Sequence, residues 1–155
     1  MTELSKSAPK ILICDVGPRD GLQSEERIWS VAERVELIDR LAASGLRRME
    51  AVSFVNPKRV PQMAGAEEVM AAIKRPGGVQ FAGLALNLRG AERAIDAGVD
   101  EVRYVVVASE SFNQRNQSAT IEKTLADFEA VSNLVAKAGL MLTATIAASF
   151  GCPFE

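Results

Sequence analysis

The chain has 155 residues, of which 48% are hydrophobic and 25% charged, and its formal net charge is −2. This composition is typical of one soluble domain that is large enough to bury a core, and it gives no electrostatic reason to expect nucleic acid as a partner. No apolar run approaches the roughly 20 residues that span a bilayer, so we also expect no membrane partner. Cytoplasm is the expected compartment.

The chain is expected to begin with a polar tail, which is followed by a strand, a helix and a second strand. Residues 1–10 lack the apolar core of a signal peptide, and we expect them to form a flexible tail. Residues 11–16 are nearly all apolar, as in a parallel strand that is buried on both faces. Residues 31–44 carry apolar side chains at spacings of three and four, which predicts an amphipathic helix. A second strand is expected at residues 48–52.

The same alternation of helix and strand repeats to the end of the chain. Three of the expected helices end in a small residue followed by glycine, at Gly45, Gly98 and Gly139, which is the chemistry of a helix-to-strand turn. The remaining predicted helices are residues 65–73, 91–97 and 118–138, and the remaining predicted strands are residues 79–85, 101–107 and 141–147.

This order of elements predicts an α/β domain with a parallel sheet and about four and a half βα units. No linker or change of composition divides residues 11–155, so we expect one domain. A doubly wound sheet closes with about this many strands, whereas a TIM barrel needs eight units. The pattern alone therefore leaves a small open sheet and half of a barrel as alternatives.

The loop after the first expected strand places an arginine and an aspartate at the functional edge of either architecture, because ligands bind at the carboxyl ends of parallel strands. Asp20 is suited to bind a hard divalent cation, and Arg19 to stabilise negative charge on an oxygen. A structural turn with a surface ion pair is the alternative interpretation. The sequence has no G-x-G-x-x-G segment and no P-loop, which argues against the commonest nucleotide sites.

The same loop also resembles a known family. Residues 16–23 are similar to the signature that opens the hydroxymethylglutaryl-CoA lyases, which are DRE-TIM metallolyases. The resemblance runs from about residue 11 to residue 155 and implies that the chain is the N-terminal half of a TIM (β/α)8 barrel. Further segments resemble the family in the family's own order, namely residues 50–58, 60–63, 87–90 and 151–155.

The resemblance implies a metal-dependent carbon-carbon lyase that cleaves 3-hydroxy-3-methylglutaryl-CoA to acetyl-CoA and acetoacetate. By resemblance, Asp20 matches the aspartate that binds Mg²⁺ or Mn²⁺, and Arg19 matches the arginine that stabilises the enolate oxygen. Gln23 and Glu50 match a glutamine and a glutamate close to that site. Glu50 is expected to orient Arg19, the metal shell or the substrate, and a buried carboxylate paired with an arginine is the alternative.

Several loop residues are expected to face the acyl-CoA thioester substrate. We expect Ser53 and Asn87 to contact it. Asn56, Lys58 and Arg89 lie in loops on the same expected face, where basic side chains suit the phosphates of coenzyme A. Solvated surface positions are the alternative for these loop residues.

The resemblance also implies groups that this sequence lacks. In the family, two histidines of a His-x-His motif, an asparagine and a mobile cysteine complete the site, whereas this chain contains no histidine. We therefore expect the chain alone to be inactive as a lyase. Two other hypotheses stay open: a related DRE-TIM enzyme that acts on another 3-hydroxyacyl-CoA or runs a Claisen-type condensation, and a non-catalytic half-barrel that assembles with itself, as a homo-oligomer, or with a complementary half.

Overall fold

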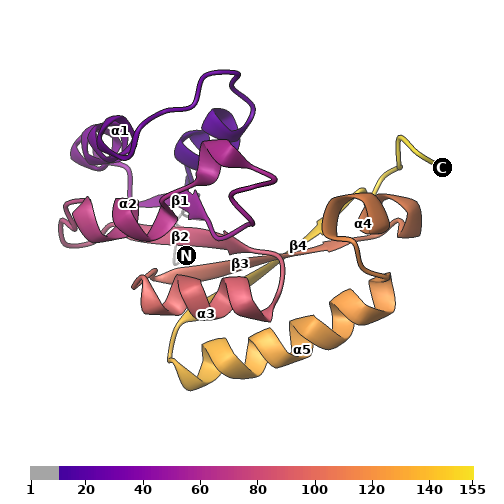
Figure 1. Ribbon diagram of the computed structural model, residues 1–155. Coiled ribbons are helices and arrows are strands. Elements are labelled where there is room, and N and C mark those ends of the chain that lie inside the picture. The colour runs from indigo at the N-terminus through magenta and orange to yellow at the C-terminus, as the bar shows by residue number, and fades with distance from the viewer. Residues whose placement is uncertain (1–10) are drawn as a thin grey trace, which may run out of the picture.

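The computed structural model describes residues 11–155 and shows a parallel four-stranded sheet with helices between the strands (Figure 1). The expected tail, residues 1–10, lies outside the described residues. The strands lie side by side in chain order, without the reversal that marks a doubly wound sheet, so the described sheet is a section of barrel wall. The strands are β1 (Arg48–Ser53), β2 (Gln80–Ala85), β3 (Glu101–Val107) and β4 (Met141–Ala147).

The helices between the strands cover the outer face of this wall. Helix α2 packs on β1, α3 on β2, and α5 on both β3 and β4, while α1 contacts α2. Figure 1 shows α4 at the carboxyl end of the strands. None of the described helices has the length and apolar character needed to cross a membrane. The helices are α1 (Val31–Ala43), α2 (Ala66–Ala72), α3 (Leu88–Asp96), α4 (Glu110–Gln117) and α5 (Ile121–Lys137), with short turns η1 (Gly17–Gly21) and η2 (Pro61–Met63).

The hydrophobic core lies between the sheet and its helices. Met49, Phe81 and Tyr104 point outward from β1, β2 and β3, and each is at most 1% exposed. Gly83 on β2 leaves room for a neighbouring aromatic ring, because a Cβ atom there would lie 2.6 Å from Cε2 of Phe54. Strands β1, β2 and β3 are thus buried on the helix side by tightly packed apolar side chains, whereas β4 has no buried residue.

The glycines at the predicted helix ends behave as expected. Gly45, Gly98 and Gly139 have φ angles of 99°, 74° and 71°, which lie in the left-handed region that glycine adopts without a steric penalty. The prediction of three helices closed by glycine is confirmed, and the chain turns into the next strand within a few residues of each one.

The prediction of a strand at residues 11–16 is wrong. Only Asp15 pairs with the sheet, through a single bridge to Met49 of β1, and Ile11 and Ile13 are 88% and 68% exposed. An apolar run becomes a buried strand where other strands flank it on both sides, and β1 is its one neighbour among the described strands.

The predicted helix at residues 118–138 is in fact two helices. Ser118 has a φ of 56° and ends α4, and Thr120 then caps α5 by accepting a hydrogen bond from the backbone of Lys123 at 3.1 Å. Helix α4 was not predicted because its sequence, ESFNQRNQ, has no apolar stripe. The third helix begins at Leu88, three residues before the predicted start, because Asn87 caps it.

Candidate functional site

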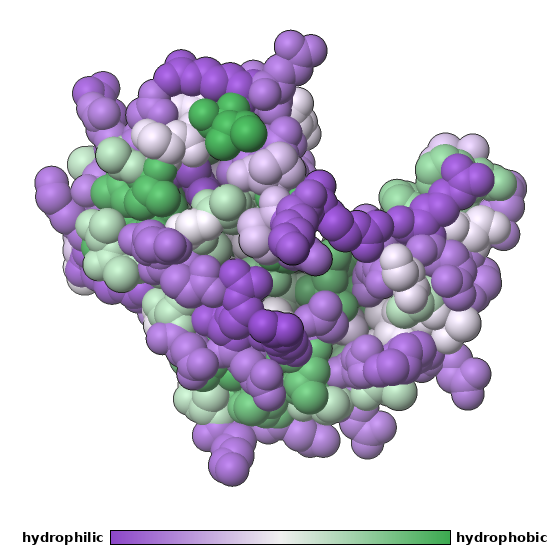
Figure 2. All heavy atoms as spheres, in the orientation of Figure 1, coloured by the Kyte–Doolittle hydropathy of each residue, from purple (hydrophilic) through white to green (hydrophobic). Residues whose placement is uncertain are grey.

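A cleft of about 610 Å³ opens at the carboxyl ends of the strands. Figure 2 shows it as a hollow between the lobe formed by α4 and the rest of the molecule. The side chains of Leu84 and Val105, from β2 and β3, line its apolar part. Four predicted site residues also line this cleft, namely Arg19, Asp20, Gln23 and Asn87.

The turn η1 positions Arg19 and Asp20 directly after the bridge to β1. The backbone N–H of Asp20 donates to the carbonyl oxygen of Val16 at 2.7 Å, and that of Gly17 donates to Oδ1 of Asp15 at 2.8 Å. These contacts fix the turn at both ends. As a result the Arg19 side chain points inward and is 16% exposed, whereas the Asp20 carboxylate is 61% exposed at the cleft.

The guanidinium of Arg19 lies between two carboxylates. Its Nε donates to Oε1 of Glu50, and its Nη1 donates to Oδ1 of Asp20 at 2.9 Å. The Glu50 side chain, on β1, is 3% exposed, and its second oxygen, Oε2, accepts a hydrogen bond from Nη1 of Arg103 at 2.8 Å. Both Glu50 oxygens are therefore occupied, an arrangement that suits a role in orienting Arg19 rather than in taking up a proton.

Behind Glu50, the inner face of the sheet carries an ionic network that the sequence reasoning missed. Nε of Arg103 donates to Glu101 at 3.2 Å, and Nε and Nη2 of Arg48 donate to the same carboxylate at 2.9 and 2.6 Å. Burial opposes ionisation of Glu101, but hydrogen bonds from Arg48 and Thr143 and the charge of Arg103 together hold its pKa below the ordinary value. The available signal was charged residues two apart within each of two apolar strands.

Three residues that were predicted to lie at the site, Gln23, Ser53 and Asn87, differ in their burial and in their hydrogen bonds. Oε1 of Gln23 is buried and has no hydrogen-bond partner among the described residues. Ser53 is fully buried and does not line the cleft, and its Oγ is likewise unpaired within residues 11–155. Oδ1 of Asn87 accepts a hydrogen bond from the backbone N–H of Gly90 at 2.8 Å, so this side chain caps α3 at the wall of the cleft.

Basic side chains stand on two sides of the cleft. Arg59 follows the loop after β1, and its Nη1 donates to Oγ of Ser118 at 3.3 Å. Arg115 comes from α4 and lies over the ring of Phe154, with 4.2 Å from Cζ to the ring centroid. Sequence reasoning missed Arg115 because α4 was not expected. Of the weaker candidates, Asn56 lines the cleft, and the exposed Lys58 and Arg89 do not.

Oxygen ligands for a metal are present but few. Among residues 11–155 no group of three or more His, Cys, Asp or Glu side chains converges. Oδ2 of Asp20 accepts no hydrogen bond from the described residues, and Gln23, whose Oε1 is buried and unpaired within residues 11–155, lines the same cleft. Carboxylate and amide oxygens suit Mg²⁺ or Mn²⁺, which complete their shells with further oxygen ligands and water. The donor chemistry fits such a cation, and these residues supply only part of its shell.

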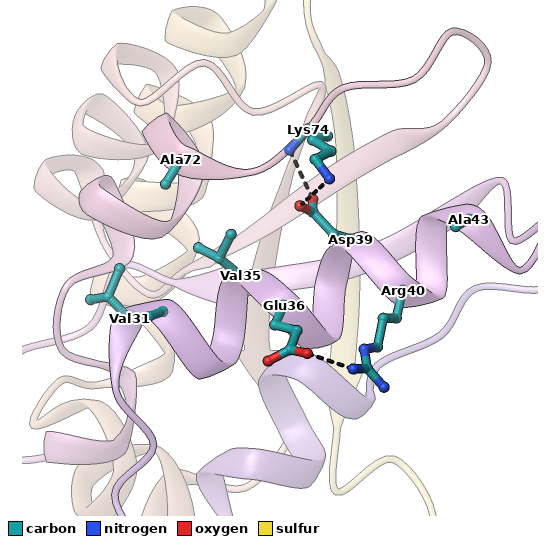
Figure 3. Close-up of a pocket in the computed structure, with 9 residues that line it drawn as sticks. Val31, Val35, Glu36, Asp39, Arg40, Ala43, Ala72 and Lys74 are labelled. Atoms are coloured by element: carbon teal, nitrogen blue, oxygen red, sulfur yellow. Dashed lines mark hydrogen bonds and ion pairs between the residues drawn. The ribbon is translucent and has the colours of Figure 1, made fainter.

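A second groove, of about 800 Å³, lies along α1 beside Ala72 and Lys74 (Figure 3). It shares no lining residue with the cleft. Its apolar part is formed by Val31, Val35 and Ala72. Its charges satisfy one another, because Glu36 pairs with Arg40 at 2.6 Å and Asp39 accepts a hydrogen bond from the backbone of Lys74 at 2.8 Å. The groove therefore offers surface without a convergent polar centre.

Comparison with known proteins gives a consistent result. The family model described as HMGL-like matches residues 10–155. The 3-hydroxy-3-isohexenylglutaryl-CoA/hydroxy-methylglutaryl-CoA lyase of Pseudomonas aeruginosa is 43% identical over 94% of this chain and 49% of that protein. The mitochondrial hydroxymethylglutaryl-CoA lyase of Homo sapiens is 38% identical over 94% of this chain and 45% of that protein.

Solved structures agree with the fold. An HMG-CoA lyase from Acinetobacter baumannii, solved with coenzyme A and 3-methylmalate, superposes with a TM-score of 0.90 at 35% identity over all of this chain and 50% of that chain. The chain thus spans about half the length of these relatives and corresponds to their N-terminal half. The prediction of half a TIM barrel is confirmed. The chain belongs to the HMGL-like family.

Proposed function

We propose that this chain carries the enolate-stabilising part of the active site of a divalent-metal-dependent lyase, which cleaves 3-hydroxy-3-methylglutaryl-CoA to acetyl-CoA and acetoacetate. The observation that carries the proposal is the pairing of Arg19 with Glu50, which holds a guanidinium at the cleft beside the exposed carboxylate of Asp20. Membership of a family whose relatives include hydroxymethylglutaryl-CoA lyases supports the choice of substrate.

The high-energy species that such a cleavage must form is the enolate of acetyl-CoA. A base takes the proton of the tertiary hydroxyl, the carbon-carbon bond breaks as the ketone of acetoacetate forms, and the electron pair of that bond becomes the enolate of the thioester. Return of a proton to the enolate carbon then gives acetyl-CoA. Nη2 of Arg19 makes no hydrogen bond within residues 11–155 and is available to donate to the enolate oxygen. One fixed donor of this kind typically stabilises the transition state by about 3 to 4 kcal/mol.

Asp20 is the residue that would hold the divalent cation, with Gln23 as a candidate second oxygen ligand. When bound, the cation supplies Lewis-acid polarisation of the substrate oxygens and lowers the pKa of the hydroxyl group. The hydrogen bond between Asp20 and Nη1 of Arg19 ties the two functions together, because the same carboxylate that would face the cation also restrains the guanidinium.

The rest of the cleft suits an acyl-CoA thioester. The side chains of Arg59 and Arg115 are suited to phosphate groups, and Asn87 also lines the cleft. The apolar surface of Leu84 and Val105 suits the acyl group. Ser53 is fully buried and pairs with Leu84 in the register of β1 and β2, so it supports this surface without contacting the substrate.

Release of acetyl-CoA by the full-length protein, with Mg²⁺ or Mn²⁺ present, tests the proposal. We expect Arg19→Met to lower kcat by about 10²- to 10³-fold and Asp20→Ala to weaken Mn²⁺ binding. Arg40→Met on the outer side of α1 is the matched control and should leave both unchanged. Normal turnover in Arg19→Met or Asp20→Ala would exclude the assigned roles. The 155-residue chain alone should release no acetyl-CoA.

A related substrate is the second candidate. The Pseudomonas aeruginosa relative is named for a longer branched substrate, 3-hydroxy-3-isohexenylglutaryl-CoA, as well as the methyl compound. The cleft of the present chain has an apolar part formed by Leu84, Leu86 and Val105 that suits a longer branch. Comparing kcat/KM for the two thioesters decides between these substrates, since the preferred one must have the higher value.

A further inference from the structure

Two arginine–glutamate pairs cross β2 on the inner face of the sheet. In the parallel register, Glu50 of β1, Ala82 of β2 and Glu101 of β3 lie in one row. Arg48, two residues before Glu50, pairs with Glu101, while Arg103, two residues after Glu101, pairs with Glu50. The small side chain of Ala82 in the middle of the row leaves space for the long arginine side chains to cross.

Arg103 connects the two pairs. Its Nη1 donates to Oε2 of Glu50 at 2.8 Å, its Nε donates to Oε1 of Glu101 at 3.2 Å, and its Nη2 donates to Sγ of Cys14 at 3.0 Å. The side chain is 14% exposed and does not line the cleft. Because all three guanidinium nitrogens have partners, the orientation of Arg103 is fixed from three directions.

The two carboxylates of this network bind their arginines in different ways, and Oε1 of Glu101 accepts from both Arg48 and Arg103. Arg48 uses Nε and Nη2 side by side on the two oxygens of Glu101, at 2.9 and 2.6 Å. Each oxygen of Glu50 instead has one arginine partner, Nε of Arg19 on Oε1 and Nη1 of Arg103 on Oε2. The orientation of the Glu50 carboxylate is therefore set by Arg103 together with Arg19.

We propose that Arg103 is a positioning residue that fixes the Glu50 carboxylate through Oε2 and thereby orients the guanidinium of Arg19 at the cleft. The inference rests on the proposed function of Arg19, but it concerns a side chain on β3 that touches neither the cleft nor the substrate. Removal of Arg103 leaves Oε2 of Glu50 without this partner, so the carboxylate is free to turn, and the guanidinium of Arg19 that it holds through Nε turns away from the position in which it would meet the enolate.

The first test measures the Arg19 guanidinium in the 155-residue chain by ¹⁵N NMR, with its signals assigned by their loss in Arg19→Met. We expect Arg103→Met to shift these signals, because the carboxylate to which Nε of Arg19 donates is no longer held in one orientation. Arg103→Lys should restore the original signals, because an ammonium group can still occupy Oε2. Arg40→Met, on an arginine whose side chain is 78% exposed, should change nothing.

Unchanged Arg19 signals in a folded Arg103→Met chain would overturn the inference. If that variant does not fold, Arg103→Gln gives the second reading, because a neutral amide is a weaker partner for Oε2 and should move the Arg19 signals in the same direction by less. A folded Arg103→Gln chain with unchanged signals would equally overturn the inference, and so would an Arg103→Lys chain whose signals match those of Arg103→Met.

The second test separates positioning from a merely structural role in the full-length protein. Arg103→Met should lower kcat by about tenfold while KM for the thioester changes by less than about twofold, because the lost interaction acts in the transition state. A change in thermal stability with normal kcat would instead assign Arg103 a structural role. The failure of the proposed function would be distinct, since it would leave turnover normal in Arg19→Met whatever the NMR signals show.

Discussion

The two faces of the sheet are built from the same strands by different interactions. On β3, Val102 and Tyr104 face the helices and are fully buried, whereas Glu101 and Arg103 alternate with them and face the inside. The outer face is held by apolar burial, whose contribution is proportional to the buried area and does not depend on direction. The inner face is held by paired charges, so that each side chain depends on the position of its partner.

This difference separates stability from function in the molecule. A change on the outer face leaves a cavity and is expected to weaken the whole fold. A change on the inner face leaves an unpaired charge and is expected to move the side chains that reach the cleft through Glu50. Substitutions on the two faces should therefore differ in how much they lower stability and in whether they also move side chains at the cleft.

Truncation of the outer-face core should have the largest effect on stability. Phe81 on β2 is 1% exposed, so Phe81→Ala should lower the free energy of unfolding by about 3 to 5 kcal/mol, against a typical total of about 5 to 15 kcal/mol. Urea denaturation of the 155-residue chain measures this loss. Phe150→Ala, at a fully exposed phenylalanine, is the control, and equal losses for the two variants would show that the described core does not hold the fold.

The single tyrosine of the chain reports on the outer face in alkali. Burial raises the pKa of Tyr104 to about 12, and its hydroxyl donates to the carbonyl oxygen of Thr124 at 3.2 Å. In the unfolded chain the phenol ionises near pH 10. The stabilisation is therefore complete below about pH 10, declines above it and is lost above pH 12, for a total of about 2 to 3 kcal/mol.

The ultraviolet absorbance of tyrosinate follows this titration without interference from another tyrosine. Unfolding measured over the same pH range should show a loss of stability in the parent chain that is absent from Tyr104→Phe. A tyrosinate transition near pH 10 in the folded chain would contradict the burial of Tyr104 beside α5.

Local patterns predicted the parts of the fold that local interactions determine. The left-handed turns at Gly45, Gly98 and Gly139 follow from two adjacent residues each, and they were predicted correctly. Helix α4 was missed because tertiary contacts stabilise it, through the buried Asn113, whose amide donates to the carbonyl oxygen of Ala119 and to Oγ1 of Thr124, each at 2.8 Å. No periodic signal in the sequence reports such contacts.

The candidate site likewise contains residues that the local sequence predicted and residues that it did not. Arg19 and Asp20 were found because their loop resembles a family signature, and the structure places both at the cleft. Arg103 was missed because its importance comes from Glu50 and Glu101, which lie 53 residues before it and two residues before it in the chain. The sequence does show charges two apart on apolar strands, but the pairing between β1 and β3 depends on the register across β2.

In acid, the inner face should lose its contribution to stability, which is smaller than that of the outer face. Burial opposes the charge of Glu101, but hydrogen bonds from Arg48 and Thr143 outweigh it, and the folded-state pKa lies below that of the unfolded chain. Its stabilisation is therefore present above the ordinary carboxyl pKa and lost as pH falls through the lower folded value. Glu101→Gln should cost about 2 kcal/mol at neutral pH, because Arg48 and Arg103 lose a charged hydrogen-bond partner, and should flatten the acid dependence of urea unfolding. Glu122→Gln, on the exposed surface of α5, is the control. If Glu101→Gln and the parent chain lose stability equally in acid, the charge on Glu101 contributes nothing to the fold, and the inner face is held, like the outer one, by packing alone.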